Sequence, residues 1–119
     1  MPSSKSKKTN HKTTRSAADK KLRRFHGVVM PYARHKSIRA VRRAGHEPSI
    51  HGTKLWKSSC LIIDYLKKHP PKRRKRALDA GCGWGITGIW CAKKWGSKVV
   101  SMDADPAVFP YLDAVAELN

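Results

Sequence analysis

The residues that could do chemistry gather in one short segment, ALDAGCGWGITG, at positions 77–88. An apolar stretch that predicts a buried strand runs directly into three alternating glycines, Gly81, Gly83 and Gly85, and a predicted helix follows. Glycine allows the chain to turn sharply out of a strand and lets the backbone approach a ligand closely. The start of the helix adds free N–H groups and the positive end of its dipole. These features predict a nucleotide-binding loop; the alternative is an ordinary glycine turn in an α/β protein.

The identity of the nucleotide depends on where the motif begins. A literal Gly-x-Gly-x-x-Gly starts at Gly83, and Asp103 follows 20 residues later, as in the dinucleotide fingerprint. That fingerprint requires its first glycine where the strand ends, and a start at Gly83 would bury the charged Asp79 inside a parallel strand. A start at Gly81 places Asp79 at the carboxyl end of the strand, facing the ligand crevice, but Ile86 then stands where the last glycine is required. The residues therefore disfavour a dinucleotide.

The order Asp-x-Gly-x-Gly-x-Gly, from Asp79 to Gly85, resembles the first motif of the class I S-adenosylmethionine-dependent methyltransferases. A carboxylate at this place suits a ligand that carries an amino-acid ammonium group, whereas it would repel a pyrophosphate. The resemblance implies that S-adenosylmethionine is the cofactor and that Asp79 and the loop backbone orient its methionine part. It also implies that Asp103 accepts hydrogen bonds from both ribose hydroxyls. Asp105 is a competing acid, but its place before Pro106 is better explained by a helix cap.

A second resemblance lies upstream, where Gly52 and Trp56 form a Gly-x-x-x-Trp element before a predicted helix. This element and residues 103–119 are similar to the methyltransferase-like protein-lysine methyltransferases, which often have Glu in place of Asp79. The resemblance covers about residues 49–119 and implies a protein-lysine acceptor and a Trp56 that lies against the cofactor. The alternative is that Trp56 only packs the helix on the sheet. The residues expected to bind the cofactor are Trp56, Asp79, Gly81, Cys82, Gly83, Gly85 and Asp103.

The remaining reactive side chains have simpler interpretations. Methyl transfer from a sulfonium needs no enzyme thiol, so Cys82 is interpreted as a small loop residue. The three cysteines form no Cys-x-x-Cys pair, which predicts reduced thiols, and no histidine has zinc-finger spacing with a cysteine pair. We therefore expect no metal. The catalytic residues are unknown, because the segment that would supply them is expected to be missing from these residues. No apolar run approaches the ~20 residues that span a bilayer, so no membrane contact is expected.

Charge divides the chain into two unequal parts. Residues 1–76 hold 23 of the 26 Lys and Arg but only three of the eight acids, whereas residues 77–119 hold three bases and five acids. The first part therefore carries about +20, which favours contact with RNA or a ribonucleoprotein through the basic leader. The alternative is a solvated tail that only aids solubility. The run Lys72–Arg76 matches a simple nuclear-localisation pattern, but a solvated connector between helix and sheet is the favoured interpretation. A cytoplasmic location is expected.

The predicted fold class is α/β, the N-terminal portion of a Rossmann-like parallel sheet in the order β-α-β-α, preceded by a helix and a basic leader. Three segments are expected: a disordered basic leader (1–24), a helical basic segment before the core (25–76), and an incomplete S-adenosylmethionine-binding domain (77–119). The expected helices are Ala17–Phe25, Tyr32–Ala44, Ser58–His69, Gly85–Trp95 and one starting at Asp105-Pro106; the expected strands are Ala77–Ala80 and Lys98–Met102.

The length of the chain limits what it can do alone. The fold implied by the resemblance has seven strands, and only two are expected within these 119 residues. A parallel sheet needs both faces covered, so we expect a fragment, or a chain that needs a second chain or a C-terminal half. By itself the chain is too short to be active, and any turnover belongs to the methyltransferase that it resembles.

Overall fold

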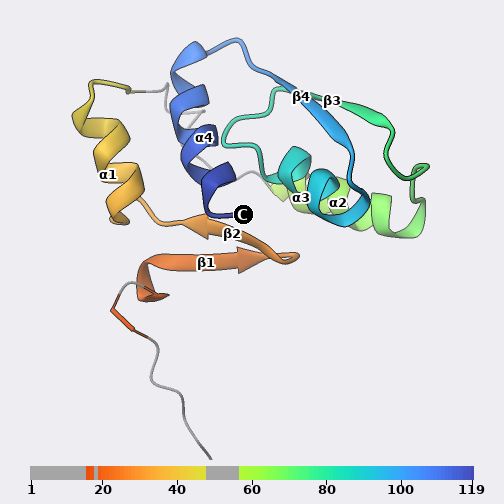
Figure 1. Ribbon diagram of the computed structural model, residues 1–119, viewed down its shortest axis with the longest axis horizontal. Coiled ribbons are helices and arrows are strands. Elements are labelled where there is room, and N and C mark those ends of the chain that lie inside the picture. The colour runs from red at the N-terminus through yellow and green to blue at the C-terminus, as the bar shows by residue number, and fades with distance from the viewer. Residues whose placement is uncertain (1–15, 18, 48–56) are drawn as a thin grey trace, which may run out of the picture.

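The computed structural model describes residues 16–17, 19–47 and 57–119. An antiparallel hairpin and a parallel strand pair lie on different sides of the helices α3 and α4, and α1 lies beside α4 (Figure 1). Within the described residues, no helix is long and apolar enough to cross a membrane. The elements are β1 (Leu22–Phe25), β2 (Val28–Pro31), α1 (Lys36–Arg43), α2 (Lys57–Lys68), β3 (Arg76–Ala80), α3 (Ile86–Trp95), β4 (Lys98–Met102) and α4 (Phe109–Glu117), with 3₁₀ turns at Asp19–Lys21 and Pro106–Val108.

The parallel pair that was predicted from the sequence is present. β3 and β4 pair with Arg76 opposite Lys98 and Ala80 opposite Met102, and α3 connects them. α3 ends at Gly96, whose φ of 63° is the left-handed conformation that favours glycine after a helix. The α/β fold class and both strands are confirmed.

The two faces of this strand pair differ. Side chains at alternate positions face α3, which packs across β3 and β4. On the opposite face, Leu78, Val100 and Met102 are 63%, 60% and 52% exposed. A parallel pair normally buries both faces, so within the described residues only one of the two apolar faces is covered.

The N-terminal hairpin is the main departure from the sequence prediction. The helix expected at Ala17–Phe25 is wrong, because a short 3₁₀ turn there leads into β1, which also takes in the last residues of the expected leader. β2 is buried throughout and pairs antiparallel with β1 around His26 and Gly27, which have φ angles of 52° and 84°. Positive φ at both turn residues is the signature of a two-residue hairpin turn. Burial of β2 against α3 and α4 therefore decides the conformation of β1.

Both helices of the segment before the core differ in detail from expectation. α1 begins at Lys36 instead of Tyr32, because His35 caps it and Tyr32 N–H donates to the hairpin. α2 matches its expected span within one residue, but not all of its apolar residues are buried. Leu61 and Tyr65 are more than 60% exposed, and Ile63 is the fully buried side chain. α2 packs on α3 through the face that carries Ile63 and Leu66.

The core surrounds α3. Trp90 and Trp95 are buried and meet edge to face with ring centroids 4.6 Å apart. Met30 from β2, Ile63 from α2 and Val115 from α4 pack in the same cluster. The helix that follows the glycine loop is thereby fixed by three elements distant in sequence.

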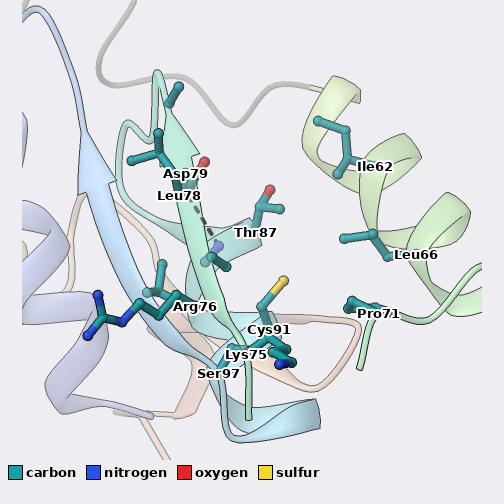
Figure 2. Close-up of a pocket in the computed structure, with 14 residues that line it drawn as sticks. Ile62, Leu66, Pro71, Lys75, Arg76, Leu78, Asp79, Thr87, Cys91 and Ser97 are labelled. Carbon is teal, nitrogen blue, oxygen red and sulfur yellow. Dashed lines mark hydrogen bonds between the residues drawn. The ribbon is translucent and has the colours of Figure 1, made fainter. Parts of the chain in front are cut away.

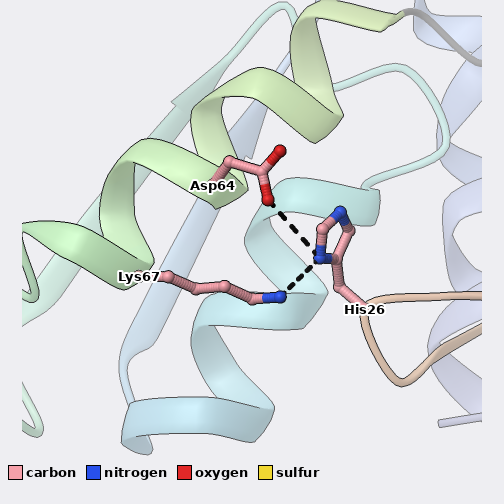
Figure 3. Close-up of polar contacts among 3 residues, drawn as sticks. All are labelled: His26, Asp64 and Lys67. Carbon is pink, nitrogen blue, oxygen red and sulfur yellow. Dashed lines mark hydrogen bonds and ion pairs between the residues drawn. The ribbon is translucent and has the colours of Figure 1, made fainter.

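Polar contacts attach the hairpin to the helices. At its turn, His26 Nδ1 lies 2.7 Å from Lys67 Nζ and 4.0 Å from Asp64 Oδ1, both on α2 (Figure 3). At the other side, the Asn119 amide pairs with both backbone groups of Val29: its oxygen accepts from Val29 N at 2.8 Å, and its nitrogen donates to Val29 O at 2.8 Å. Asn119 therefore satisfies the outer edge of β2 as a neighbouring strand would.

Replacing Asn119 with Ala should destabilise the fold by about 1–3 kcal/mol, because a buried donor and acceptor on Val29 lose their partner. Urea unfolding followed by circular dichroism measures the change. Glu117→Ala, at an exposed position of α4, is the matched control and should stay within about 0.5 kcal/mol. Equal stabilities of the two variants would contradict this role of Asn119.

Candidate functional site

The glycine loop leaves β3 through three left-handed residues. Gly81, Gly83 and Gly85 have φ angles of 70°, 52° and 84°, which side-chain-bearing residues rarely adopt. Cys82 N–H donates to the carbonyl of Met102 at 2.8 Å, and Gly85 N–H donates to the carbonyl of Cys82 at 2.8 Å. The alternating glycines are thus required by a turn that crosses from β3 to the end of β4 before α3 begins.

Asp103 holds this loop against the end of β4. Its Oδ2 accepts from Gly83 N at 2.9 Å, and its Oδ1 accepts from Asp105 N at 2.9 Å. Asp105 in turn caps the 3₁₀ turn that precedes α4 by accepting from Ala107 N at 3.0 Å, which confirms the helix-cap interpretation of this second acid. Asp103 is therefore the acid at the loop, and each of its oxygens keeps further acceptor capacity.

Asp79 lies one residue before the end of β3, on the face that α3 covers. Its Oδ2 accepts from Gly88 N at 3.2 Å, in the first turn of α3 (Figure 2). Burial raises the pKa of this carboxyl group, the hydrogen bond from Gly88 opposes that rise, and the neighbouring charge of Asp103 adds to it. The carboxylate is therefore partly committed to holding α3 on the strand, beside the ligand crevice that the sequence predicted it would face.

Cys82 is a buried thiol within the loop. Burial, followed by the charges of Asp79 and Asp103, raises its pKa to about 11. The side chain is therefore protonated at neutral pH and is no nucleophile there. This geometry agrees with its interpretation as a small loop residue.

Trp84 and Tyr111 join the loop to α4 and to the N-terminal part. Their rings stack with centroids 5.1 Å apart and planes 7° from parallel, and the Tyr111 hydroxyl donates to the carbonyl of His46. The sequence analysis missed Tyr111, although its spacing of four residues before the buried Val115 was a usable signal. Trp84 thus has a packing role.

A cavity of about 450 Å³ opens between α2, β3 and α3 (Figure 2). Its wall is mainly apolar, with Ile62 and Leu66 of α2 on one side and Cys91 of α3 on the other. Asp79 and Thr87 supply polar groups at the end nearest the glycine loop. The cavity adjoins the loop without enclosing it.

The position of Trp56 and the presence of a metal site are the two remaining points of the sequence prediction. Trp56 lies outside the described residues. Across the described ranges, no group of three or more His, Cys, Asp and Glu side chains could hold a metal ion. The structure thus brings together Asp79, Gly81, Cys82, Gly83, Gly85 and Asp103 around one loop.

The raised pKa of Asp79 predicts how stability depends on pH. A carboxyl group with a raised pKa binds its proton more tightly in the folded state, so stability falls as pH rises from the ordinary value of 3.8 through the folded value. Asp79→Asn removes this loss of stability with rising pH, and the asparagine side-chain oxygen can still accept the hydrogen bond from Gly88 N. The variant should have the higher Tm at pH 7, and the difference should vanish near pH 3.8. Asp113→Asn, at an exposed position, is the control; a wild-type advantage that grows with pH would contradict the assignment.

The close approach of α3 to β3 and β4 predicts the effect of adding one methyl group. A Cβ at Gly88 would lie 2.8 Å from Val99 Cγ1 and 3.1 Å from Asp79 Oδ2. Gly88→Ala should therefore destabilise the fold by about 1–3 kcal/mol, measured by urea unfolding. Ala92→Ser, which adds one atom at an exposed position of the same helix, should change stability by less than about 0.5 kcal/mol. A neutral Gly88→Ala would show that the helix does not pack this closely.

Comparison with known proteins supplies a family for this geometry. The family model of the methyltransferase small domain matches residues 47–114, which include the glycine loop, Asp103 and most of α4. A search of curated proteins and a search of solved structures gave no match. The match covers more than half of the chain, so the chain belongs to the methyltransferase small domain family, with a class I S-adenosylmethionine-dependent methyltransferase-like domain.

Proposed function

We propose that this chain binds S-adenosylmethionine at the glycine loop and forms the cofactor-binding half of a methyltransferase that acts on a macromolecule. The observation that carries the proposal is the pairing of Asp103 with Gly83, which places a carboxylate directly at a loop that has glycine at alternate positions. Family membership supports the choice of cofactor, because the methyltransferase small domain family generally uses S-adenosylmethionine.

The groups around the loop fit the chemistry of this cofactor. Each oxygen of Asp103 accepts one backbone hydrogen bond, and a carboxylate oxygen can accept a second from a ribose hydroxyl. Asp79 uses one bond on Gly88 N and keeps acceptor capacity for the ammonium of the methionine part. The cofactor-binding residues that we propose are Asp79, Gly81, Cys82, Gly83, Gly85 and Asp103, together with Trp56.

The chemistry asks mainly for alignment. When bound, S-adenosylmethionine supplies a methyl carbon already activated by its sulfonium, so the protein need only hold the donor and the acceptor in line. Asp103 and the loop would fix the position of the donor. None of the described residues is assigned as a general base.

For the acceptor, we propose a protein lysine, on the resemblance of residues 49–119 to the protein-lysine group. The second candidate is an RNA methyltransferase, or a non-catalytic RNA-binding polypeptide, and the charge of about +20 in residues 1–76 favours it. We also propose that the chain has three parts: a basic leader, a segment before the core and the cofactor-binding domain, with boundaries at residues 24 and 76. Because β1 begins at Leu22, the first boundary falls within this strand. A cytoplasmic or nuclear location fits either acceptor.

Asp103→Ala should weaken S-adenosylmethionine binding by roughly tenfold or more, because a charge-assisted acceptor is worth about 1.5–3 kcal/mol. Isothermal titration calorimetry measures it. Asp113→Ala removes the same charge from an exposed position of α4 and should bind as the wild type does. If the wild-type chain does not bind S-adenosylmethionine, or if both variants bind equally well, the proposed site is wrong.

A further inference from the structure

Two arginines stack on one tyrosine at the edge of the hairpin. The guanidinium carbon of Arg23 lies 4.8 Å from the centre of the Tyr32 ring, and that of Arg34 lies 4.9 Å from it. We call these three side chains the Tyr32 cluster. Tyr32 N–H donates to Lys21 O at 2.9 Å, and Arg34 Nη2 donates to Lys20 O at 3.1 Å. The cluster is therefore held by main-chain bonds on both sides and is not a pair of free side chains.

The charge of this cluster is not neutralised by the residues around it. Among the described residues, no carboxylate lies within 4.0 Å of the Arg23 or Arg34 side chain. Arg23 Nε is buried and has no hydrogen-bond partner there. Two like charges on one ring repel each other, so an external anion would stabilise the arrangement.

The wider charge distribution attracts a polyanion to the basic part of the chain, to which this cluster belongs. Residues 19–47, which form the hairpin and α1, contain nine Lys and Arg and two acids, a net charge of +7. Residues 77–119, which form the glycine loop and its strands, carry three bases and five acids, a net charge of −2. The hairpin runs beneath α4, and α1 lies on the other side of α4 from the parallel strand pair (Figure 1). Residues 57–76 contain eight Lys and Arg and one acid, which is also a net charge of +7. A polyanion is therefore attracted to both basic segments and not to the cofactor loop. Of these two segments, the hairpin and the turn after it carry arginines stacked on aromatic rings.

The side-chain types favour nucleic acid over an acidic protein. Six of the nine bases in residues 19–47 are arginine, whose planar guanidinium binds phosphate through two donors and also stacks on aromatic rings and bases. Tyr32 is 37% exposed, and Arg34 is exposed beside it. An acidic peptide would interact with the positive charges alone, whereas the unpaired nucleobases of a single strand can also stack on the guanidinium and ring planes.

We propose that the Tyr32 cluster is a binding site for single-stranded nucleic acid, in which Arg23 and Arg34 contact phosphates and an unstacked base lies on the exposed guanidinium or ring. The site consists of the hairpin and the turn before α1. It does not depend on the proposed cofactor site, and of the basic leader (1–24) it includes Arg23 and none of residues 1–15.

Fluorescence anisotropy with the full-length chain and a short labelled single-stranded RNA tests this site. Arg34→Ala and Tyr32→Leu should each weaken binding by roughly fivefold to tenfold, in the range of one lost stacking contact. Arg34→Ala should also reduce the dependence of affinity on salt by about one phosphate contact, whereas Tyr32→Leu should leave it unchanged. Arg34→Lys keeps the charge but loses the plane, and should bind as weakly as Tyr32→Leu.

The control is Arg24→Ala, which removes the same charge from an exposed position of β1 and should weaken binding less than about twofold. Single-stranded DNA of the same sequence shows which sugar is preferred, and polyglutamate tests the acidic-protein alternative. The proposal is overturned if Arg24→Ala weakens binding as much as Arg34→Ala, if Arg34→Lys restores full affinity, or if polyglutamate binds with the same sensitivity to Tyr32→Leu. Circular dichroism and S-adenosylmethionine titration of each variant separate a folding defect or a failed cofactor site from a failure of this surface.

Discussion

The carboxylate of Asp103 at the end of β4 accepts the N–H of Gly83 with one oxygen and the N–H of Asp105 with the other. Through these two bonds one side chain sets the course of the glycine loop and the entry to α4. The loop crosses from β3 to β4 with three residues in the left-handed conformation, which only glycine adopts at low cost. The position of the proposed cofactor site therefore depends on a single acid and on the glycines at alternate positions of the loop.

The helix behind the loop needs support from parts of the chain that are distant in sequence. α3 is packed by α2 on one side and by β2 and α4 on others, and Gly88 lets it approach β3 closely. Asn119 completes the edge of β2, and Tyr111 connects Trp84 of the loop to the carbonyl of His46. The basic N-terminal part is thus built into the same fold as the methyltransferase-like core.

The C-terminal part could be predicted from the sequence because its signals are local. Alternating glycines, the cap at Asp105 and the stop at Gly96 fix the ends of the strands and helices within a few residues. The hairpin could not be predicted in this way, because β1 is rich in arginine and becomes a strand only when β2 is buried on α3 and α4. The buried face of α2 also depends on tertiary packing, which buries Ile63 and leaves the neighbouring Leu61 and Ile62 exposed. Asp79 was located correctly along the strand, but its bond to Gly88 required the three-dimensional fold.

The central claim is that the loop held by Asp103 is where S-adenosylmethionine binds. Two-dimensional ¹H–¹⁵N spectra recorded during a titration with S-adenosylmethionine test it most directly, because each backbone N–H reports its own surroundings. We predict that the largest shifts occur at the N–H groups that lie in the loop or donate to Asp103, those of Gly81, Gly83, Gly85 and Asp105. Shifts confined to the α2 side of the neighbouring cavity, or no saturable shifts, would contradict it.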